Sequence, residues 1–113
     1  MYTILFKGKW LSINAAYSKH YHQRNKVKKE YQATFTQLLT EAQIKPLSAF
    51  RIHLRYNSRM DLDNTVAGLK VMVDTMREMK LAENDTKTIY KGLTVEPDLS
   101  LKHNMYIVSI IPE

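Results

Sequence analysis

The spacing of apolar residues, which switches between two periods along the chain, constrains the fold more than any other feature. Apolar and polar side chains alternate between residues 50 and 56, the period-two pattern of a strand with one buried face. On either side of this run, apolar residues recur every three or four positions, as on one face of an amphipathic helix. Because neither element can bury its apolar face alone, the pattern predicts a sheet covered by helices.

The apolar spacing predicts elements in the order strand, helix, strand, helix, strand, strand. The strands are expected at residues 2–6, 50–56, 88–95 and 105–111, and the helices at 24–42 and about 61–79. Asp61 or Asp63 is expected to cap the second helix. The core face of that helix is expected to carry Leu62, Val66, Leu69, Val73 and Met76. The 113 residues suit one domain, an α+β (mixed α/β) fold with a small mixed sheet covered by two main helices.

Composition excludes several classes of function. The chain has no cysteine, which excludes disulfides, thiolate zinc sites and thiol catalysis. Its three glycines form no phosphate-binding loop, so we expect no nucleotide cofactor. The apolar N-terminus lacks a basic region and is interrupted by Lys7 and Lys9 before it reaches a membrane-spanning length. We therefore expect a soluble, cytoplasmic protein with no membrane partner.

A net charge of +6 favours a polyanionic partner, because basic side chains gain affinity by releasing counterions from phosphates. The segment 17–29 is rich in both aromatic and basic residues, which are interleaved along it, and this mixture suits contacts to phosphates and unpaired bases. The alternative is an ordinary exposed loop and helix start. His20 and His22 lack a third nitrogen or sulfur ligand at a suitable spacing for a metal. The expected nucleic-acid contacts are Lys19, His20, His22, Arg24, Lys26, Lys28, Lys29, Arg55 and Arg59.

Acidic residues fall in two tight clusters, one at the start of the second helix and one on the loop after it. Asp61 and Asp63 are two residues apart, so in extended backbone both carboxylates lie on the same side. Two such carboxylates repel each other unless a cation lies between them, and hard divalent cations prefer carboxylate oxygens. This pattern indicates a site for Mg²⁺, for which Mn²⁺ can substitute.

A polar stripe runs along the second helix. Asp63, Ala67, Lys70 and Asp74 stand at offsets of zero, four, seven and eleven, which is one narrow line on a helix. Lys70 is placed to neutralise developing charge or contact a phosphate, and Asp74 to support or join the metal ligands. The alternative is a solvated face with a Lys70–Asp74 pair and an aspartate acting only as a helix cap.

Three motifs follow one another in the second half of the chain. They are Asp61-Leu62-Asp63-Asn64, then Lys70 with Asp74 four residues later, and then Asn84-Asp85 ahead of Tyr90-Lys91-Gly92. In order and spacing they resemble the signature of the RusA-like Holliday junction resolvases of bacteria and phages, and the likeness covers residues 56–95. The resemblance implies a homodimeric, Mg²⁺-dependent endodeoxyribonuclease that binds four-way DNA junctions and acts in recombination and repair.

The resemblance also implies roles for single positions. Asp61, Asp63 and Asp85 match the metal-binding aspartates and Asp74 the helix aspartate. Lys70 matches the catalytic lysine of some phage-type relatives.

Two departures accompany this match. The better-known members of the family carry a lysine where this chain has Ala67, and Asn84 replaces the first aspartate of the loop pair. The alternatives are a non-catalytic nucleic-acid-binding module and an inactive member of the same family.

Overall fold

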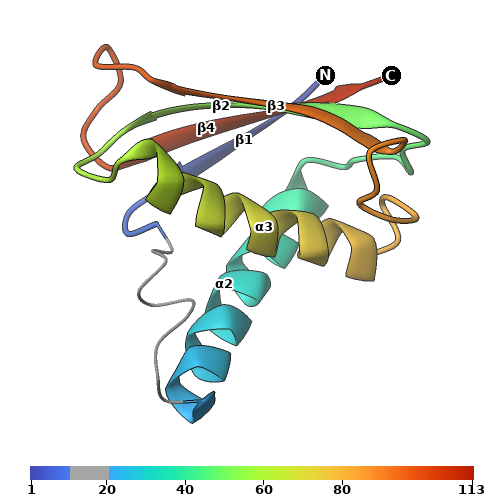
Figure 1. The fold of residues 1–113 in the computed structure, drawn as a ribbon, viewed down its shortest axis with the longest axis horizontal. Coiled ribbons are helices and arrows are strands. Elements are labelled where there is room, and N and C mark those ends of the chain that lie inside the picture. Colours follow the sequence, from blue (N-terminus) through green and yellow to red (C-terminus); the bar gives the residue numbers. More distant parts are fainter. Residues whose placement is uncertain (11–20) are drawn as a thin grey trace.

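The computed structural model describes residues 1–10 and 21–113, with the side chains of residues 21–24 left out. Its elements are β1 (Tyr2–Lys7), α2 (Tyr21–Glu41), β2 (Phe50–Asn57), α3 (Leu62–Glu78), β3 (Tyr90–Pro97) and β4 (Met105–Pro112) (Figure 1). The order is the one that the apolar spacing predicts. Neither described helix is long and apolar enough to cross a membrane.

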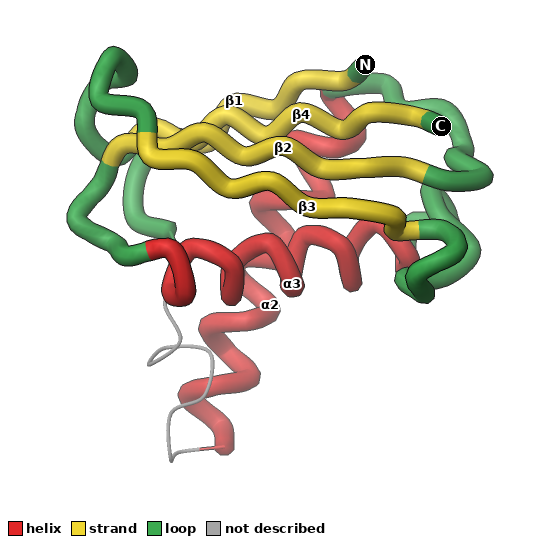
Figure 2. Tube along the Cα trace, turned by 45° about the horizontal axis from the view of Figure 1, so that its top comes forward, coloured by secondary structure: helices red, strands yellow, loops and turns green. Residues whose placement is uncertain are grey.

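The four strands form one mixed sheet in the order β1-β4-β2-β3. β4 lies antiparallel to both β1 and β2, whereas β2 and β3 are parallel and are joined through α3 (Figure 2). Both described helices lie on the same side of the sheet, and no described element covers its other face, which is called the open face below (Figures 1 and 2). The predicted α+β fold with two helices over a small mixed sheet is therefore confirmed.

The core lies between the sheet and the helices. Its strand residues come from alternate positions, such as Ile52 and Leu54 in β2, as the period-two pattern predicts. Leu69, Val73 and Met76 are buried on α3, as expected for its core face. Burial of these side chains is the main favourable contribution to folding.

The prediction that Leu62 and Val66 belong to the core is wrong, since they are 45% and 38% exposed. The inner side of the first turns of α3 is instead formed by small residues, which leave room for Trp10. The indole Nε1 of Trp10 donates a hydrogen bond to the carbonyl oxygen of Thr65 at 2.7 Å. A Cβ on Gly68 would lie 2.2 Å from the same nitrogen. The indole therefore occupies the place that larger side chains of α3 would fill.

Two elements, α2 and β3, have boundaries that differ from the predicted ones by more than one residue. α2 begins at Tyr21, three residues before the expected start. β3 spans Tyr90–Pro97, two residues later than expected. The shift arises because the carbonyl oxygen of Thr86 accepts hydrogen bonds from the amides of Ile89 and Tyr90, which closes a turn where the strand was expected to begin.

Candidate functional site

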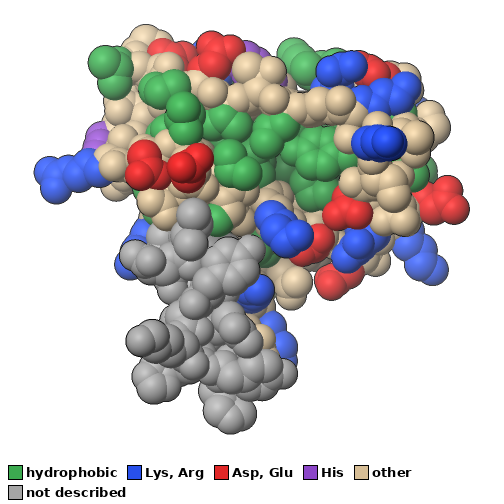
Figure 3. Space-filling model, in the orientation of Figure 1, with side chains coloured by type: hydrophobic (Ala, Val, Ile, Leu, Met, Phe, Trp, Pro, Cys, Tyr) green, Lys and Arg blue, Asp and Glu red, His purple; other side chains and the backbone are tan. Residues whose placement is uncertain are grey.

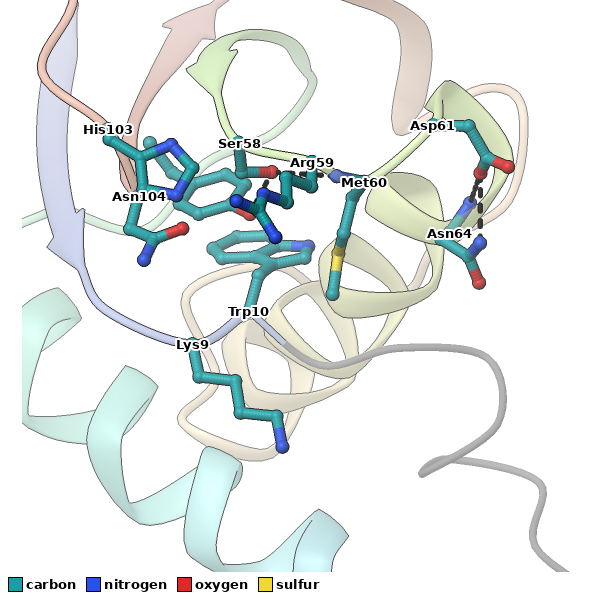
Figure 4. Close-up of a pocket in the computed structure, with 10 residues that line it drawn as sticks. Lys9, Trp10, Ser58, Arg59, Met60, Asp61, Asn64, His103 and Asn104 are labelled. Carbon is teal, nitrogen blue, oxygen red and sulfur yellow. Dashed lines mark hydrogen bonds between the residues drawn. The ribbon is translucent and has the colours of Figure 1, made fainter.

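The candidate site lies where β2 ends and α3 begins, at the segment 58–61 that joins them. Two open hollows flank this segment, with volumes of about 590 and 530 Å³. The larger hollow is bordered by the basic side chains Lys9, Arg59 and His103 (Figure 4). Asp63 borders the smaller hollow, and Asp61 borders both. Acidic and basic groups therefore meet at one end of the sheet.

Aromatic rings beneath the site hold the segment 58–61 in place. Trp10, Tyr106 and Tyr56 form a stacked column, with ring centroids 4.5 and 5.7 Å apart. The hydroxyl of Tyr106 lies 2.6 Å from the hydroxyl of Ser58, and that of Tyr56 donates to the carbonyl oxygen of Met60 at 3.1 Å. Because the rings are buried in the core, these hydrogen bonds anchor the loop to rigid elements.

Asp61, one of the two residues expected to cap α3, is its N-cap. Its backbone is extended, and its Oδ1 accepts hydrogen bonds from the amide and the side-chain nitrogen of Asn64 at 3.1 and 2.9 Å (Figure 4). Asp63 lies in the first turn of the helix with its side chain exposed. Both carboxylates therefore lie at the positive end of the helix dipole, which lowers the cost of bringing two negative charges together.

Asp74 and Asp85 lie at the other end of α3. Each pairs with Arg77, Asp74 with Nη2 and Asp85 with Nη1, both at 3.6 Å. The rise of an α-helix places Arg77 about 21 Å from Asp63 along the axis. Within one chain the structure thus separates Asp85 from Asp61 and Asp63, and the described residues contain no group of three acidic or histidine side chains able to hold a metal ion.

The polar stripe on α3 is present, but Lys70 and Asp74 do not form the ion pair that the alternative interpretation of this stripe predicts. Lys70 is exposed about two turns from Asp63 and forms no ion pair with the described residues. Asp74 pairs with Arg77, one turn further on, rather than with Lys70. Lys70 is therefore available to an anionic ligand that approaches along this side of the helix.

The expected nucleic-acid contacts are spread over several parts of the molecule. Lys19 and His20 lie outside the described residues, and His22 and Arg24 lie in the first turn of α2, where side chains are left out. The other members of the set are Lys26, Lys28 and Lys29 on α2, Arg59 beside the larger hollow, and Arg55 on β2. Only Arg59 of these described side chains borders the hollows next to Asp61.

Arg55 projects from the open face of the sheet, away from the helices. The same face of β2 carries Arg51, His53 and Arg55, and each of the three has an acidic partner. Arg55 donates to Asp98 at 3.0 Å. Hydrogen bonds from Ser100, and to a lesser extent this arginine, hold the pKa of Asp98 below its usual value. The pairing reduces the net charge that this face offers to a phosphate.

Sequence reasoning missed the basic wall of the larger hollow. Lys9 follows β1 and His103 precedes β4, and these segments meet because β1 and β4 are antiparallel neighbours. The amide of Gly8 donates to the carbonyl oxygen of Asn104 at 2.9 Å, which fixes the two segments side by side. Nothing in the local sequence around Lys9 or His103 indicates this meeting, since it depends on the strand order.

The chain matches no protein-family model and no curated protein sequence. The resemblance to the RusA-like resolvases therefore rests on the motifs of this sequence, and the candidate site rests on its geometry.

Proposed function

We propose that this protein is an Mg²⁺-dependent endodeoxyribonuclease of the RusA-like type, which cuts four-way junctions and other branched DNA in the cytoplasm of a bacterium or an infected host. One observation carries the proposal: Asp61 and Asp63 border the same open hollow at the start of α3, beside a second hollow with a basic wall. A module that only binds DNA gains nothing from two carboxylates at this place, because they repel phosphate.

The donor set fits a hard divalent cation. Mg²⁺ commonly uses one or two protein carboxylates and keeps waters and substrate phosphates as its other ligands. Asp61 and Asp63 supply two carboxylates, and both hydrogen bonds of the helix cap go to Oδ1 of Asp61, so its Oδ2 takes part in neither. When bound, the ion supplies charge stabilisation on the scissile phosphate and lowers the pKa of an attacking water.

The remaining tasks fall to basic side chains. Arg59 and Lys9 border the hollow next to Asp61, where they would bind the DNA backbone on one side of the cut. Lys70 lies further along α3 on the same stripe as Asp63, where its ammonium would bind the backbone on the other side. Their common role is to position the strand and reduce the negative charge of its phosphates.

The proposal includes a homodimer, because cutting opposed strands of a two-fold junction calls for two sites. A homodimer would also bring Asp85, which lies far from Asp63 within one chain, to the metal site of the second copy. Since the acidic residues lie at both ends of α3, two copies whose α3 helices run antiparallel would set the Asp85 end of one beside the Asp63 end of the other. In that arrangement Asp85 would join the metal ligands from the second copy.

Neutralisation of single carboxylates tests the catalytic role. Asp63→Asn and Asp61→Asn should each abolish Mg²⁺-dependent cleavage of a labelled four-way junction while junction affinity stays within a few-fold of wild type. Asparagine is as good an N-cap as aspartate, so Asp61→Asn removes the charge and keeps the helix start. Glu41→Gln is the matched control, since Glu41 is an exposed carboxylate at the end of α2 and belongs to neither end of α3.

Equal loss of binding and cleavage in Asp63→Asn, or an effect of the same size in Glu41→Gln, would contradict the metal role. The second candidate function is a non-catalytic DNA-binding module or an inactive family member. It is favoured by the structural use of Asp61 as a helix cap and by the pairing of Asp74 and Asp85 with Arg77. Tight junction binding without cutting in Mg²⁺ or Mn²⁺ would select it.

A further inference from the structure

β3 forms one edge of the sheet, and its outer side is not paired with any strand of the described residues. The surface next to this edge is apolar: Leu93 of β3 is 41% exposed and Leu99, just after the strand, is 85% exposed. Leu62 of α3 borders a hollow together with Leu99, Val66 is exposed one turn further along the helix, and Figure 3 shows hydrophobic side chains gathered between the edge strand and the helix. An unpaired edge strand with apolar flanks is a template for pairing with another strand.

We propose that a second copy of this chain pairs along β3, antiparallel and with a two-fold axis through Thr94. The pairing would join two four-stranded sheets into one continuous sheet of eight strands. It deepens the proposed function and rests on it in part, because that function calls for two copies. Its other support is the self-complementarity of β3.

The two-fold axis restricts which residues can face each other. An axis perpendicular to the sheet keeps each face on the same side, so opposed residues must point to the same face. With the axis at Thr94, Leu93 lies opposite Val95 of the second copy on the helix side, and the two Thr94 side chains meet on the open face. Leu93 and Val95 pair with Ile52 and Leu54 of β2, which places both on the helix side. Apolar pairs and Thr–Thr pairs of this kind stabilise antiparallel strands.

The charges on the open face also match in this register. Glu96, whose side chain is largely exposed, would lie opposite Gly92 of the second copy. The guanidinium of Arg51 lies over Gly92, since a Cβ there would be 2.3 Å from its Nη1. Each Glu96 carboxylate would therefore approach the Arg51 of the other copy, and the symmetry makes this contact twice. The alternative axis through Leu93 would set Val95 opposite Lys91 and Glu96 opposite Tyr90, which matches neither apolar nor charged groups.

The ends of the strand limit the pairing. Lys91 lies at the register irregularity between β2 and β3, and Pro97, which has no amide hydrogen, ends the strand. With the axis at Thr94 these two residues face each other at both ends of the shared ladder. Because the two-fold axis uses the β3 edge of both copies, no β3 edge is left for a third copy and the assembly closes as a dimer.

A cysteine cross-link tests the register directly, because the chain has no cysteine of its own. In Thr94→Cys the two Cα atoms would be about 4.5–5.5 Å apart, within the range that a disulfide spans. We expect a covalent dimer under mild oxidation. In Glu96→Cys the two positions would be about 13 Å apart, which excludes a disulfide. Thr3→Cys on the opposite edge strand β1 is the control for random collision.

The oligomeric state of the wild-type chain completes the test. Light scattering should give twice the 13.2 kDa mass of the chain, and Leu93→Glu should reduce the dimer fraction while circular dichroism stays unchanged. A monomeric wild type, or a dimer that Thr94→Cys does not cross-link, would overturn the inference. These results are independent of nuclease activity. A monomer that cuts junctions would refute the β3 dimer and the homodimer of the proposed function but not the nuclease activity, and a cross-linked dimer without activity would refute the nuclease activity but not the β3 dimer.

Discussion

Replacement of Gly68 by alanine should destabilise the protein, although the same change in an exposed helix stabilises it. Gly68 lies inside α3 with no unusual backbone angle, so its role is the space it leaves for Trp10. The added Cβ would lie 2.2 Å from Nε1 and 2.4 Å from Cε2 of the indole ring. The ring is packed against Tyr106 and Phe35 and must move away from the helix.

The magnitude follows from three contributions. Alanine gains about 1 kcal/mol over glycine in helix propensity. Overpacking of a filled core costs about 1–3 kcal/mol. Displacement of the indole also breaks its 2.7 Å hydrogen bond to Thr65, and a buried donor without a partner costs about 1–3 kcal/mol. From the middle of these ranges, Gly68→Ala should lower the free energy of unfolding by about 3 kcal/mol.

Urea unfolding measures this loss, and Trp10 is the single tryptophan of the chain, so its fluorescence reports on the site itself. The matched test is the same substitution in a Trp10→Phe background, followed by circular dichroism. A phenyl ring is smaller and has no donor, so Gly68→Ala should cost much less there. An equal cost in both backgrounds, or unchanged stability of Gly68→Ala alone, would refute the explanation based on the contact with Trp10.

Three further predictions concern stability. Burial raises the pKa of Tyr90 to about 12 from 10.0, so the folded state keeps a proton that the unfolded state loses. The free energy of unfolding should therefore fall as the pH rises from about 10 to 12, and urea titrations at both pH values should show a smaller fall in Tyr90→Phe. Asp61→Ala should lose about 1 kcal/mol of stability, whereas Asp61→Asn should lose little, because only alanine removes the helix cap. Arg77→Ala should change stability by less than about 1 kcal/mol in thermal unfolding, since both its ion pairs are partly exposed and long, at 3.6 Å.

The sequence predicts the order of elements because apolar periodicity is local. Phe50 to Tyr56 alternates over one buried face, and that alternation survives in β2. The cap of α3 is equally local, since Asp61 bonds a residue only three positions away. The N-terminal end of the candidate site could be predicted for the same reason, because Asp61 and Asp63 are neighbours in the sequence.

Features that depend on tertiary packing were not predictable. Leu62 and Val66 continue the apolar stripe of α3, but Trp10 occupies the core beside the first turns of the helix. Only the strand order places Trp10 there, through the pairing of β1 with β4. The position of Asp85 is similarly non-local: its distance from Asp63 depends on the length of α3, and a motif spacing does not specify whether the two residues meet within one chain.

Cleavage of an end-labelled four-way junction by the wild-type protein in Mg²⁺, beside a linear duplex of the same sequence, tests the proposed nuclease activity most simply. We expect paired nicks near the branch point that disappear when the metal is chelated, and no cutting of the duplex. Stable junction binding with no nicks in either Mg²⁺ or Mn²⁺ would contradict the nuclease activity.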